Sequence, residues 1–365
     1  MRDFSTVKRV VIKIGTNTLA RDGGVDSGYV ESVARQVAEL LQSGRQVVIV
    51  TSGAIGMGAG QLAMKGPVKG MKMRQACAAI GQPLLMQEYR RAFAAQGITV
   101  AQVLLTAEVL NHRKTYLNLR NSIDTLLNLS VVPVLNENDS VSTEEIGTAF
   151  GDNDRLSALV ASKIDADLLI MLSDVDALYD KNPREHPDAK PISTVHEITA
   201  DLLAHAGSAG SRYATGGMKT KLAAARIASN AGCRMVLANG RAENVIAAIM
   251  VGQPIGTVFL PSRKLSSRQR WILNSAAAGT IRIDAGAVAA LRNHKSLLPS
   301  GIVAVEGSFG KGAVVMINDQ AKAVTGIGSE QIKALAGKHS NQIKSLLGPG
   351  HRGEVAVADD IVFIE

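Results

Sequence analysis

Cysteine and aromatic residues are scarce in this chain of 365 residues. It has two cysteines, Cys77 and Cys233, and only 6 Phe, 5 Tyr and 1 Trp. Two cysteines supply neither a disulfide framework nor a Cys-based metal cluster, so we expect a reducing compartment, the cytoplasm. So few aromatic side chains argue against a surface on which nucleic-acid bases stack.

Long apolar runs are also missing. No run reaches the roughly 18–20 residues that a membrane-spanning helix needs, and no apolar segment precedes the first predicted strand. We therefore expect neither a membrane span nor a signal peptide. The chain is 46% hydrophobic and 20% charged, as globular proteins are, and its length suggests two domains.

Two familiar enzyme motifs are absent. The Walker A pattern Gly-x4-Gly-Lys-Ser/Thr does not occur, because the Gly-Lys pairs at 310–311 and 337–338 lack the upstream glycine. The seven histidines show no metal-ligand spacing, and there is no His-Glu-x-x-His. A P-loop NTPase and a zinc hydrolase are therefore disfavoured.

Residues 1–260 alternate short β-branched runs with helical hydrophobic spacing. Apolar strands separated by helices predict an open, mostly parallel α/β sheet that is sandwiched by helices. Pro133 predicts that its strand lies at an edge or has an irregular ladder. The predicted strands are 10–14, 46–50, 98–105, 131–135, 168–172 and 234–238, and the predicted helices are 27–41, 73–95, 115–129, 153–163 and 218–230.

The character of the sequence changes after Leu260. Residues 261–278 are polar and basic and read as a linker, and residues 279–360 predict a small, mostly β domain. Residues 271–365 hold 9 basic and 8 acidic side chains, so most of the net charge of +8 lies in the larger domain. The expected strands of the small domain are 280–284, 302–306, 313–317, 354–357 and 361–364, with one helix at 285–294.

Polar and glycine-rich sequences follow four of the predicted strands. Because ligands of open α/β sheets bind outside the carboxyl ends of the strands, we expect one composite site there. Lys13 lies inside an apolar strand, and it must reach a counter-charge or solvent because burying an unpaired charge is costly. The four segments are 13–18, 51–56, 136–140 and 173–174.

Two further segments carry candidate binding residues. Residues 215–221 place a Gly-Gly turn and two lysines at the start of a helix, which is either an anion site or a plain turn with solvated lysines. Asn153 and Asp154 open another helix, where they are helix caps or substrate contacts. Asp174 is a turn residue or a nucleotide contact.

In combination these motifs resemble the amino-acid kinase superfamily, and within it the glutamate 5-kinase (γ-glutamyl kinase) family, over essentially the whole chain. The segment Ser296–Gly301 resembles the start of the inner motif of a PUA domain, which many bacterial members carry at the C-terminus. The motifs that carry the resemblance are Val-Ile-Lys-Ile-Gly-Thr at 11–16, Val-Thr-Ser-Gly-Ala-Ile at 50–55, Val-Pro-Val-Leu-Asn-Glu-Asn-Asp at 132–139, Gly-Asp-Asn-Asp at 151–154 and Thr-Gly-Gly-Met-x-Thr-Lys at 215–221.

The resemblance implies transfer of the γ-phosphoryl group of ATP, with Mg²⁺, to the side-chain carboxylate of L-glutamate, on the route to proline. Lys13, Asp154 and Lys221 would be catalytic. Ser52, Asp139 and Asn153 would bind glutamate. ATP would be held by Lys13, Ser173, Asp174, Thr215, Gly216, Gly217, Met218, Lys219, Thr220 and Lys221. Feedback inhibition by L-proline is implied for the family, and we expect a homo-oligomer, either a dimer or a tetramer.

Two other functions remain open at this point. The same fold could phosphorylate another acceptor, such as aspartate, N-acetylglutamate, carbamate or a nucleoside monophosphate. The PUA domain and the basic residues of the linker could instead bind RNA, although the near-neutral small domain and the few aromatic residues weaken this reading. The Gly-, Met- and Lys-rich segment 53–75 reads either as a mobile loop over the acceptor site or as a plain surface loop.

Overall fold

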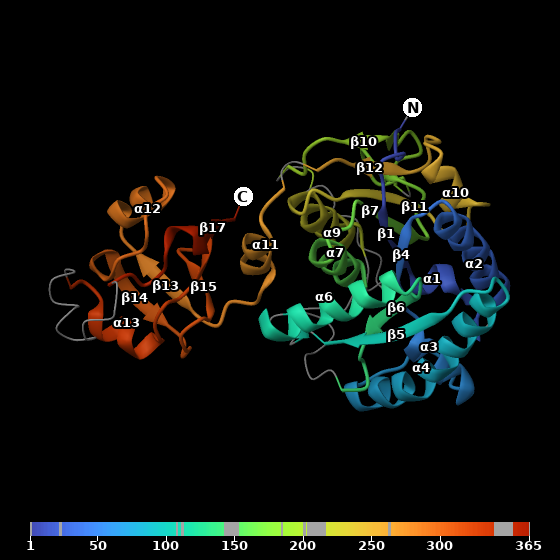
Figure 1. The fold of residues 1–365 in the computed structure, drawn as a ribbon, viewed down its shortest axis with the longest axis horizontal. Coiled ribbons are helices and arrows are strands. Elements are labelled where there is room, and N and C mark those ends of the chain that lie inside the picture. Colours follow the sequence, from blue (N-terminus) through green and yellow to red (C-terminus); the bar gives the residue numbers. More distant parts are fainter. Residues whose placement is uncertain are drawn as a thin grey trace. The chain divides into compact units, whose positions relative to one another are not determined.

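The chain forms two compact units, Met1–Lys264 and Leu265–Glu365 (Figure 1). The computed structural model describes residues 2–21, 24–106, 109–110, 113–141, 153–183, 185–199, 202, 217–261, 264–338 and 353–364.

The first unit is built on an eight-stranded sheet. Neighbouring strands run parallel except at the pair β11–β12, which is antiparallel. In spatial order the strands are β10 (Thr194–Val195), β12 (Thr257–Phe259), β11 (Arg234–Asn239), β7 (Leu168–Ser173), β1 (Arg9–Ile14), β4 (Gln46–Val50), β6 (Val132–Glu137) and β5 (Val100–Leu105). The predicted open, mostly parallel α/β sheet is confirmed.

Helices cover both faces of this sheet (Figure 1). Side chains of a strand alternate between faces, so Val11 packs in one apolar core and Val10 and Ile12 pack in the other. The first core includes side chains of α6 (Arg113–Asn128), α7 (Asn153–Lys163) and α9 (Met218–Asn230), and the second includes side chains of α2 (Ser27–Gln42), α4 (Met71–Ala94) and α10 (Val245–Met250).

Short elements complete the first unit. Helix α1 (Thr16–Leu19) follows β1 directly, and α3 (Ala54–Gln61) follows β4. Two small antiparallel ribbons pair β2 (Ala20–Arg21) with β3 (Gly24–Val25), and β8 (Leu178–Tyr179) with β9 (Pro191–Ile192). No helix in the described part of the chain is long and apolar enough to cross a membrane.

The strand that contains Pro133 is not an edge strand, so that alternative was wrong. Strand β6 lies between β4 and β5, and Pro133 is in register with Ala101 of β5. The ladder with β4 is short and involves only Val134 and Leu135 of β6. The proline is tolerated because β4 pairs with β6 only beyond it, where the backbone N–H groups are available.

Neither loop reading of residues 53–75 holds for 54–61 or from 71 onward, which are helical. Glycine at 58 and 81 lets α3 and α4 approach closely. A Cβ atom at Gly58 would lie 1.9 Å from the carbonyl oxygen of Cys77, and one at Gly81 would lie 1.9 Å from that of Ala54. Gly58, one of the glycines that suggested a loop, therefore serves helix–helix contact, as Gly81 does from α4.

The second unit has a five-stranded, mostly antiparallel sheet with its own apolar core. The expected strand at 354–357 is wrong, since this segment makes only an isolated bridge at Ala356. In spatial order the strands are β14 (Ile302–Glu306), β13 (Thr280–Ile283), β15 (Val314–Ile317), β16 (Ala321–Val324) and β17 (Ile361–Phe363), and the helices are α11 (Ser267–Asn274), α12 (Ala285–Arg292) and α13 (Ser329–Leu335), with 3-10 turns at Pro299–Gly301 and Ala358–Asp360.

Helix α11 falls within the segment that was predicted as a linker. Arg268 of this helix makes an ion pair with Asp360. Lys322 of β16 donates hydrogen bonds to the carbonyl oxygens of Leu273 (2.8 Å) and Ser275 (2.6 Å) at the end of the helix. These contacts make α11 an integral part of the second unit.

Candidate active site

Polar residues meet where the central strands of the first unit end. Lys13 is the next-to-last residue of β1, and Ser52 follows β4 by two positions. Asn136 belongs to the end of β6, and Ser173 is the last residue of β7. These strands are adjacent and parallel, so their carboxyl ends share one edge of the sheet.

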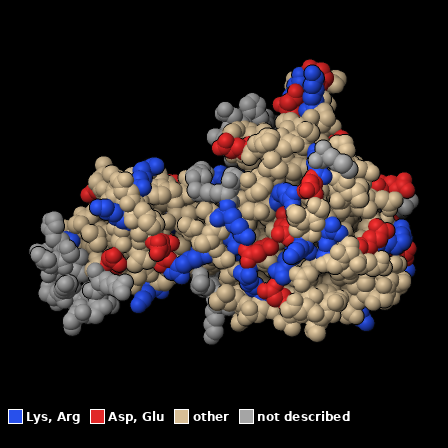
Figure 2. Space-filling view, turned by 45° about the horizontal axis from the view of Figure 1, so that its top comes forward, with Lys and Arg blue, Asp and Glu red and all other residues tan. Residues whose placement is uncertain are grey.

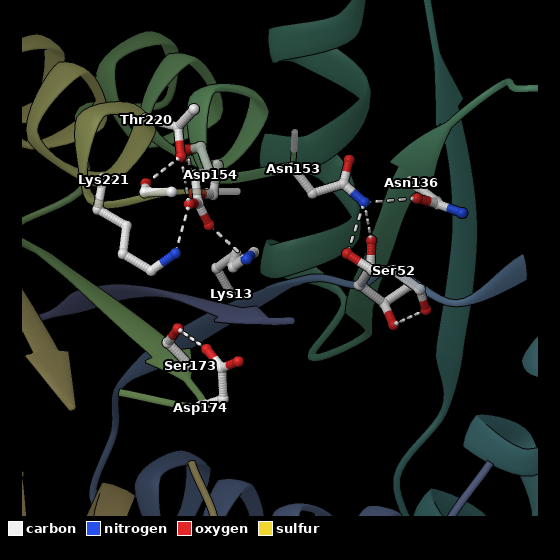
Figure 3. Close-up of polar contacts among 12 residues, drawn as sticks. Lys13, Ser52, Asn136, Asn153, Asp154, Ser173, Asp174, Thr220 and Lys221 are labelled. Carbon is white, nitrogen blue, oxygen red and sulfur yellow. Dashed lines mark hydrogen bonds and ion pairs between the residues drawn. The ribbon is translucent and has the colours of Figure 1, made fainter. Parts of the chain in front are cut away.

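Lys13, Asp154 and Lys221 form a buried group of charges, here named the ion cluster (Figure 3). Lys13 is two residues from Val11 in β1, and side chains of a strand alternate between its faces. The side chain of Lys13 therefore points to the same face as Val11, which α7 and α9 cover. Its Nζ contacts Oδ1 of Asp154 on α7, and Nζ of Lys221 on α9 lies 3.1 Å from Oδ2. Lys13 and Lys221 are each 4% exposed and Asp154 is 0% exposed.

The ion cluster carries two positive charges and one negative charge. Asp154 offsets one lysine, and Thr220 also donates a hydrogen bond to its Oδ2 (3.0 Å). The two ammonium groups lie at the end of a parallel sheet and are buried, so bulk water screens them little. The arrangement suits a multiply charged anion such as a phosphoryl group.

Asn153 is the neighbour of Asp154, but its side chain points to a different set of groups. Its Nδ2 donates to the carbonyl oxygen of Thr51 (2.6 Å), to Oγ of Ser52 (2.8 Å) and to Oδ1 of Asn136 (3.0 Å). The next residue after Ser52 is Gly53, whose φ of +102° is in the left-handed region that favours glycine. The turn after β4 thus presents both acceptors to Asn153.

Two buried side chains extend this network. Nδ2 of Asn136 donates to Oε1 of Gln82 on α4 (2.8 Å). The series Gln82, Asn136, Asn153 and Ser52 is named the amide chain here. Asn136 stood in a segment that the sequence singled out, but it was not chosen as a site residue. Gln82 lies in the middle of a helix, where a glutamine by itself gives no signal of function.

Asp139 lies on the same edge, two residues beyond β6. Burial raises the pKa of its carboxyl group to about 6, while the nearby charge of Arg74 acts in the opposite direction. Arg74 is in the first turn of α4. A half-buried carboxylate of this kind can accept a substrate ammonium group, which would favour its ionised form.

Ser173 and Asp174 form a second polar group at the end of β7 (Figure 3). Oδ1 of Asp174 accepts a hydrogen bond from Oγ of Ser173 (3.1 Å), and Oδ2 accepts one from Nδ2 of Asn17 (2.9 Å). Burial acts to raise the pKa of Asp174, but these two hydrogen bonds, a backbone hydrogen bond and the charge of Lys221 together lower it. Asn17 was not predicted as a site residue.

The predicted phosphate-binding segment 215–221 is only partly described. Gly217 is the N-cap of α9, and no side chain caps the helix there. Met218 and Lys219 lie in the first turn, where Lys219 is exposed and the helix dipole favours an anion. Thr215 and Gly216 lie outside the described residues.

A protein-built metal cage is not found in the part of the chain that the structure describes. There, no group of three or more His, Cys, Asp or Glu side chains could hold a metal ion.

Two protein-family models match separate parts of this chain. The family model described as "Amino acid kinase family" matches residues 8–239. The chain belongs to the amino acid kinase family. A second family model, described as "PUA domain", matches residues 279–347. The predicted superfamily and the C-terminal PUA domain are both confirmed.

Two curated relatives of this kinase-family chain are named glutamate 5-kinase. A protein of Methanosarcina mazei named glutamate 5-kinase is 50% identical over 328 residues, which is 87% of this chain and 85% of the relative. A glutamate 5-kinase of Caldanaerobacter subterraneus subsp. tengcongensis is 44% identical over 98% of both chains. Among solved structures, the UMP kinase of Bacillus anthracis aligns with 71% of this chain and 98% of its own, at 16% identity and a TM-score of 0.48.

Proposed function

We propose that this protein transfers the γ-phosphoryl group of ATP to the side-chain carboxylate of L-glutamate. The product would be γ-glutamyl phosphate, the first intermediate on the route to proline. The observation that carries the proposal is the buried ion cluster of Lys13, Asp154 and Lys221, set beside the amide chain. The relatives named glutamate 5-kinase, at 44–50% identity, support the choice of acceptor.

The chemistry needs charge neutralisation more than proton transfer. A glutamate side chain with a pKa of about 4.3 is already ionised near neutral pH, so no general base is required. The difficulty is to bring this anion against the phosphates of ATP. Lys13 and Lys221 would stabilise the negative charge on the transferring group, and Asp154 would hold both ammonium groups in place.

The acceptor would bind on the side of the amide chain. The nitrogen of Asn153 faces Thr51, Ser52 and Asn136, so its Oδ1 is the atom left to accept the substrate ammonium group. Asp139 would place a negative charge near the same ammonium group. Ser52 accepts from Asn153, which leaves its own hydroxyl hydrogen to donate to a substrate carboxylate.

ATP would bind on the side of β7 and α9. Ser173 and Asp174 would contact the nucleoside part, and residues 215–221 would contact the phosphates. Mg²⁺ is commonly held by one or two carboxylates together with substrate phosphates. Both carboxylate oxygens of Asp154 contact lysines, so the described residues fit a Mg²⁺ ion that is held mainly by ATP and would add further charge neutralisation.

Several expectations from the resemblance belong to the same proposal. We place the kinase domain at 1–260 and the PUA domain at 279–360, with helix α11 inside the predicted linker 261–278, and we place the protein in the cytoplasm. Assembly into a dimer or tetramer and inhibition by L-proline also remain predictions.

The direct test is to trap the acyl phosphate with hydroxylamine. The purified protein with Mg²⁺, ATP and L-glutamate should yield γ-glutamyl hydroxamate together with one ADP per hydroxamate. Aspartate, N-acetylglutamate, carbamate and UMP should release little ADP in a parallel coupled assay. No hydroxamate with glutamate but ADP release with another acceptor would contradict the proposed substrate.

The RNA-binding alternative receives little support from the basic segment before the PUA domain. Arg268 is paired with Asp360 and Arg270 is buried at 4% exposure. On the face drawn in Figure 2, acidic and basic side chains are interspersed. Salt-dependent RNA binding with a steep slope would revive this alternative.

A further inference from the structure

The amide chain has a fixed polarity. It starts at the backbone carbonyl of Thr51, which can only accept a hydrogen bond, so the group of Asn153 that faces it must be the NH₂ group. Asn136 must then offer its oxygen to Asn153 and its nitrogen to Gln82. Gln82 in turn must offer its oxygen. The carbonyl oxygen of Thr51 thus fixes the orientation of Asn153, and Asn136 must keep its oxygen toward that NH₂ group.

Gln82 ends this chain in a costly position. It is 9% exposed, and its Nε2 atom is buried and has no hydrogen-bond partner among the residues that the structure describes. The residues beside it are also poor helix formers, since Gly81 and Pro83 lie inside α4. The sequence Gly-Gln-Pro lowers the intrinsic stability of this part of the helix. Its presence indicates that these positions meet a requirement other than helix formation.

The position of α4 explains what this requirement is. The missing Cβ of Gly81 allows α4 to rest on the carbonyl oxygen of Ala54, two residues after Ser52. This close approach brings Gln82 to within hydrogen-bond distance of Asn136, which is 1% exposed. Without an acceptor from α4, the Nδ2 atom of Asn136 would be buried and unsatisfied.

We propose that Gln82 is a positioning residue that fixes the amide orientation of Asn136, so that Asn136 places an acceptor and not a second donor against the NH₂ group of Asn153. It does so by supplying, within the described part of the chain, an acceptor for the Nδ2 atom of Asn136, which leaves the oxygen of Asn136 turned toward Asn153. Asn153 then presents Oδ1 to the acceptor site, where it selects an ammonium group. This inference rests on the proposed function, because it concerns how the acceptor is bound.

The test combines Gln82→Met with Asn136→Leu in a double-mutant cycle. Methionine has nearly the size of glutamine but offers no comparable acceptor. We expect Gln82→Met to raise the KM for glutamate about tenfold, as an unsatisfied buried donor commonly does, and to leave the KM for ATP within about twofold. In the Asn136→Leu background the same change should add less than about twofold, because the group through which Gln82 acts is gone.

Controls separate positioning from general damage. Gln87→Met changes an exposed glutamine of the same helix and should leave all constants unchanged. The double variant removes both partners and leaves no unsatisfied donor, so it should fold even where Gln82→Met is destabilised. An unchanged KM in Gln82→Met, an equal factor in both backgrounds, or a parallel fall of kcat with a rise of both KM values would overturn the inference.

The outcome is separable from that of the proposed function. The wild type is assayed first, and failure with glutamate would remove the proposed substrate alone. The cycle would then be run with whichever acceptor the wild type turns over, and the same non-additivity would be required.

Discussion

Asn153 and Asp154 are neighbours in the first turn of α7, yet they serve two different regions of the site (Figure 3). Successive residues of a helix are separated by about 100°, so their side chains leave the helix in different directions. Asp154 meets Lys13 and Lys221, and Asn153 meets Ser52 and Asn136. The first turn of α7 thus contributes one residue to the ion cluster and the next residue to the uncharged amide chain.

Under the proposed function, the two regions would have separate roles: one would stabilise the transferring phosphoryl group and the other would bind the acceptor. Charge–charge interactions fall off slowly with distance and need little orientation, so the ion cluster suits the diffuse charge of a transferring phosphoryl group. Amide hydrogen bonds are short and directional, so the amide chain suits recognition of one acceptor. Substitutions in the ion cluster should therefore lower kcat, and substitutions in the amide chain should raise the KM for the acceptor.

The largest effect is expected from the ion cluster. Lys13→Ala and Lys221→Ala should each lower kcat by roughly 10²–10³-fold, by analogy with the loss of a donor that stabilises developing charge. Steady-state kinetics and a melting curve would check this. Lys8→Ala, an exposed lysine just before the same strand, is the matched control and should retain activity. Near-normal turnover in either cluster variant would refute the phosphoryl role.

A smaller effect is expected at Asp139. Asp139→Ala should raise the glutamate KM about tenfold or more, since a charge-assisted hydrogen bond to the substrate ammonium group contributes about 1.5–3 kcal/mol. The value of kcat should change little. An unchanged glutamate KM would exclude Asp139 as a substrate contact.

The pH dependence of kcat/KM for glutamate provides a second test of the role of Asp139. Because the pKa of Asp139 is raised to about 6, its carboxyl group is ionised above this pH and neutral below it. Only the ionised form attracts an ammonium group, so kcat/KM for glutamate should fall as the pH falls through about 6. Asp139→Asn should abolish this limb of the profile. A limb that persists in Asp139→Asn would assign the titration to another group.

The smallest effect is expected at Asn17. Its hydrogen bond to Asp174 is exposed, so Asn17→Ala should raise the KM for ATP only about threefold, which corresponds to roughly 0.6 kcal/mol. The glutamate KM should not change. A larger change in the glutamate KM than in the ATP KM would place Asn17 on the acceptor side and break the division between the regions.

Much of this site could be predicted because its residues break local rules in the sequence. Lys13 interrupts an apolar strand, and Ser52 and Ser173 lie just past the predicted strands 46–50 and 168–172. Gln82 gave no such signal, since a glutamine is ordinary in a helix and its partner Asn136 is 54 residues away. Residues 54–61 were misread because glycine favours loops as well as close helix contacts, and only the packing partner decides between them.

The most direct test of the division compares Asn153→Ala with Asp154→Asn in one assay. We expect Asn153→Ala to raise the glutamate KM about tenfold or more with kcat nearly unchanged. We expect Asp154→Asn to lower kcat about a hundredfold or more with the glutamate KM nearly unchanged. Equal losses of kcat in both variants, with no change in the glutamate KM of either, would contradict the division.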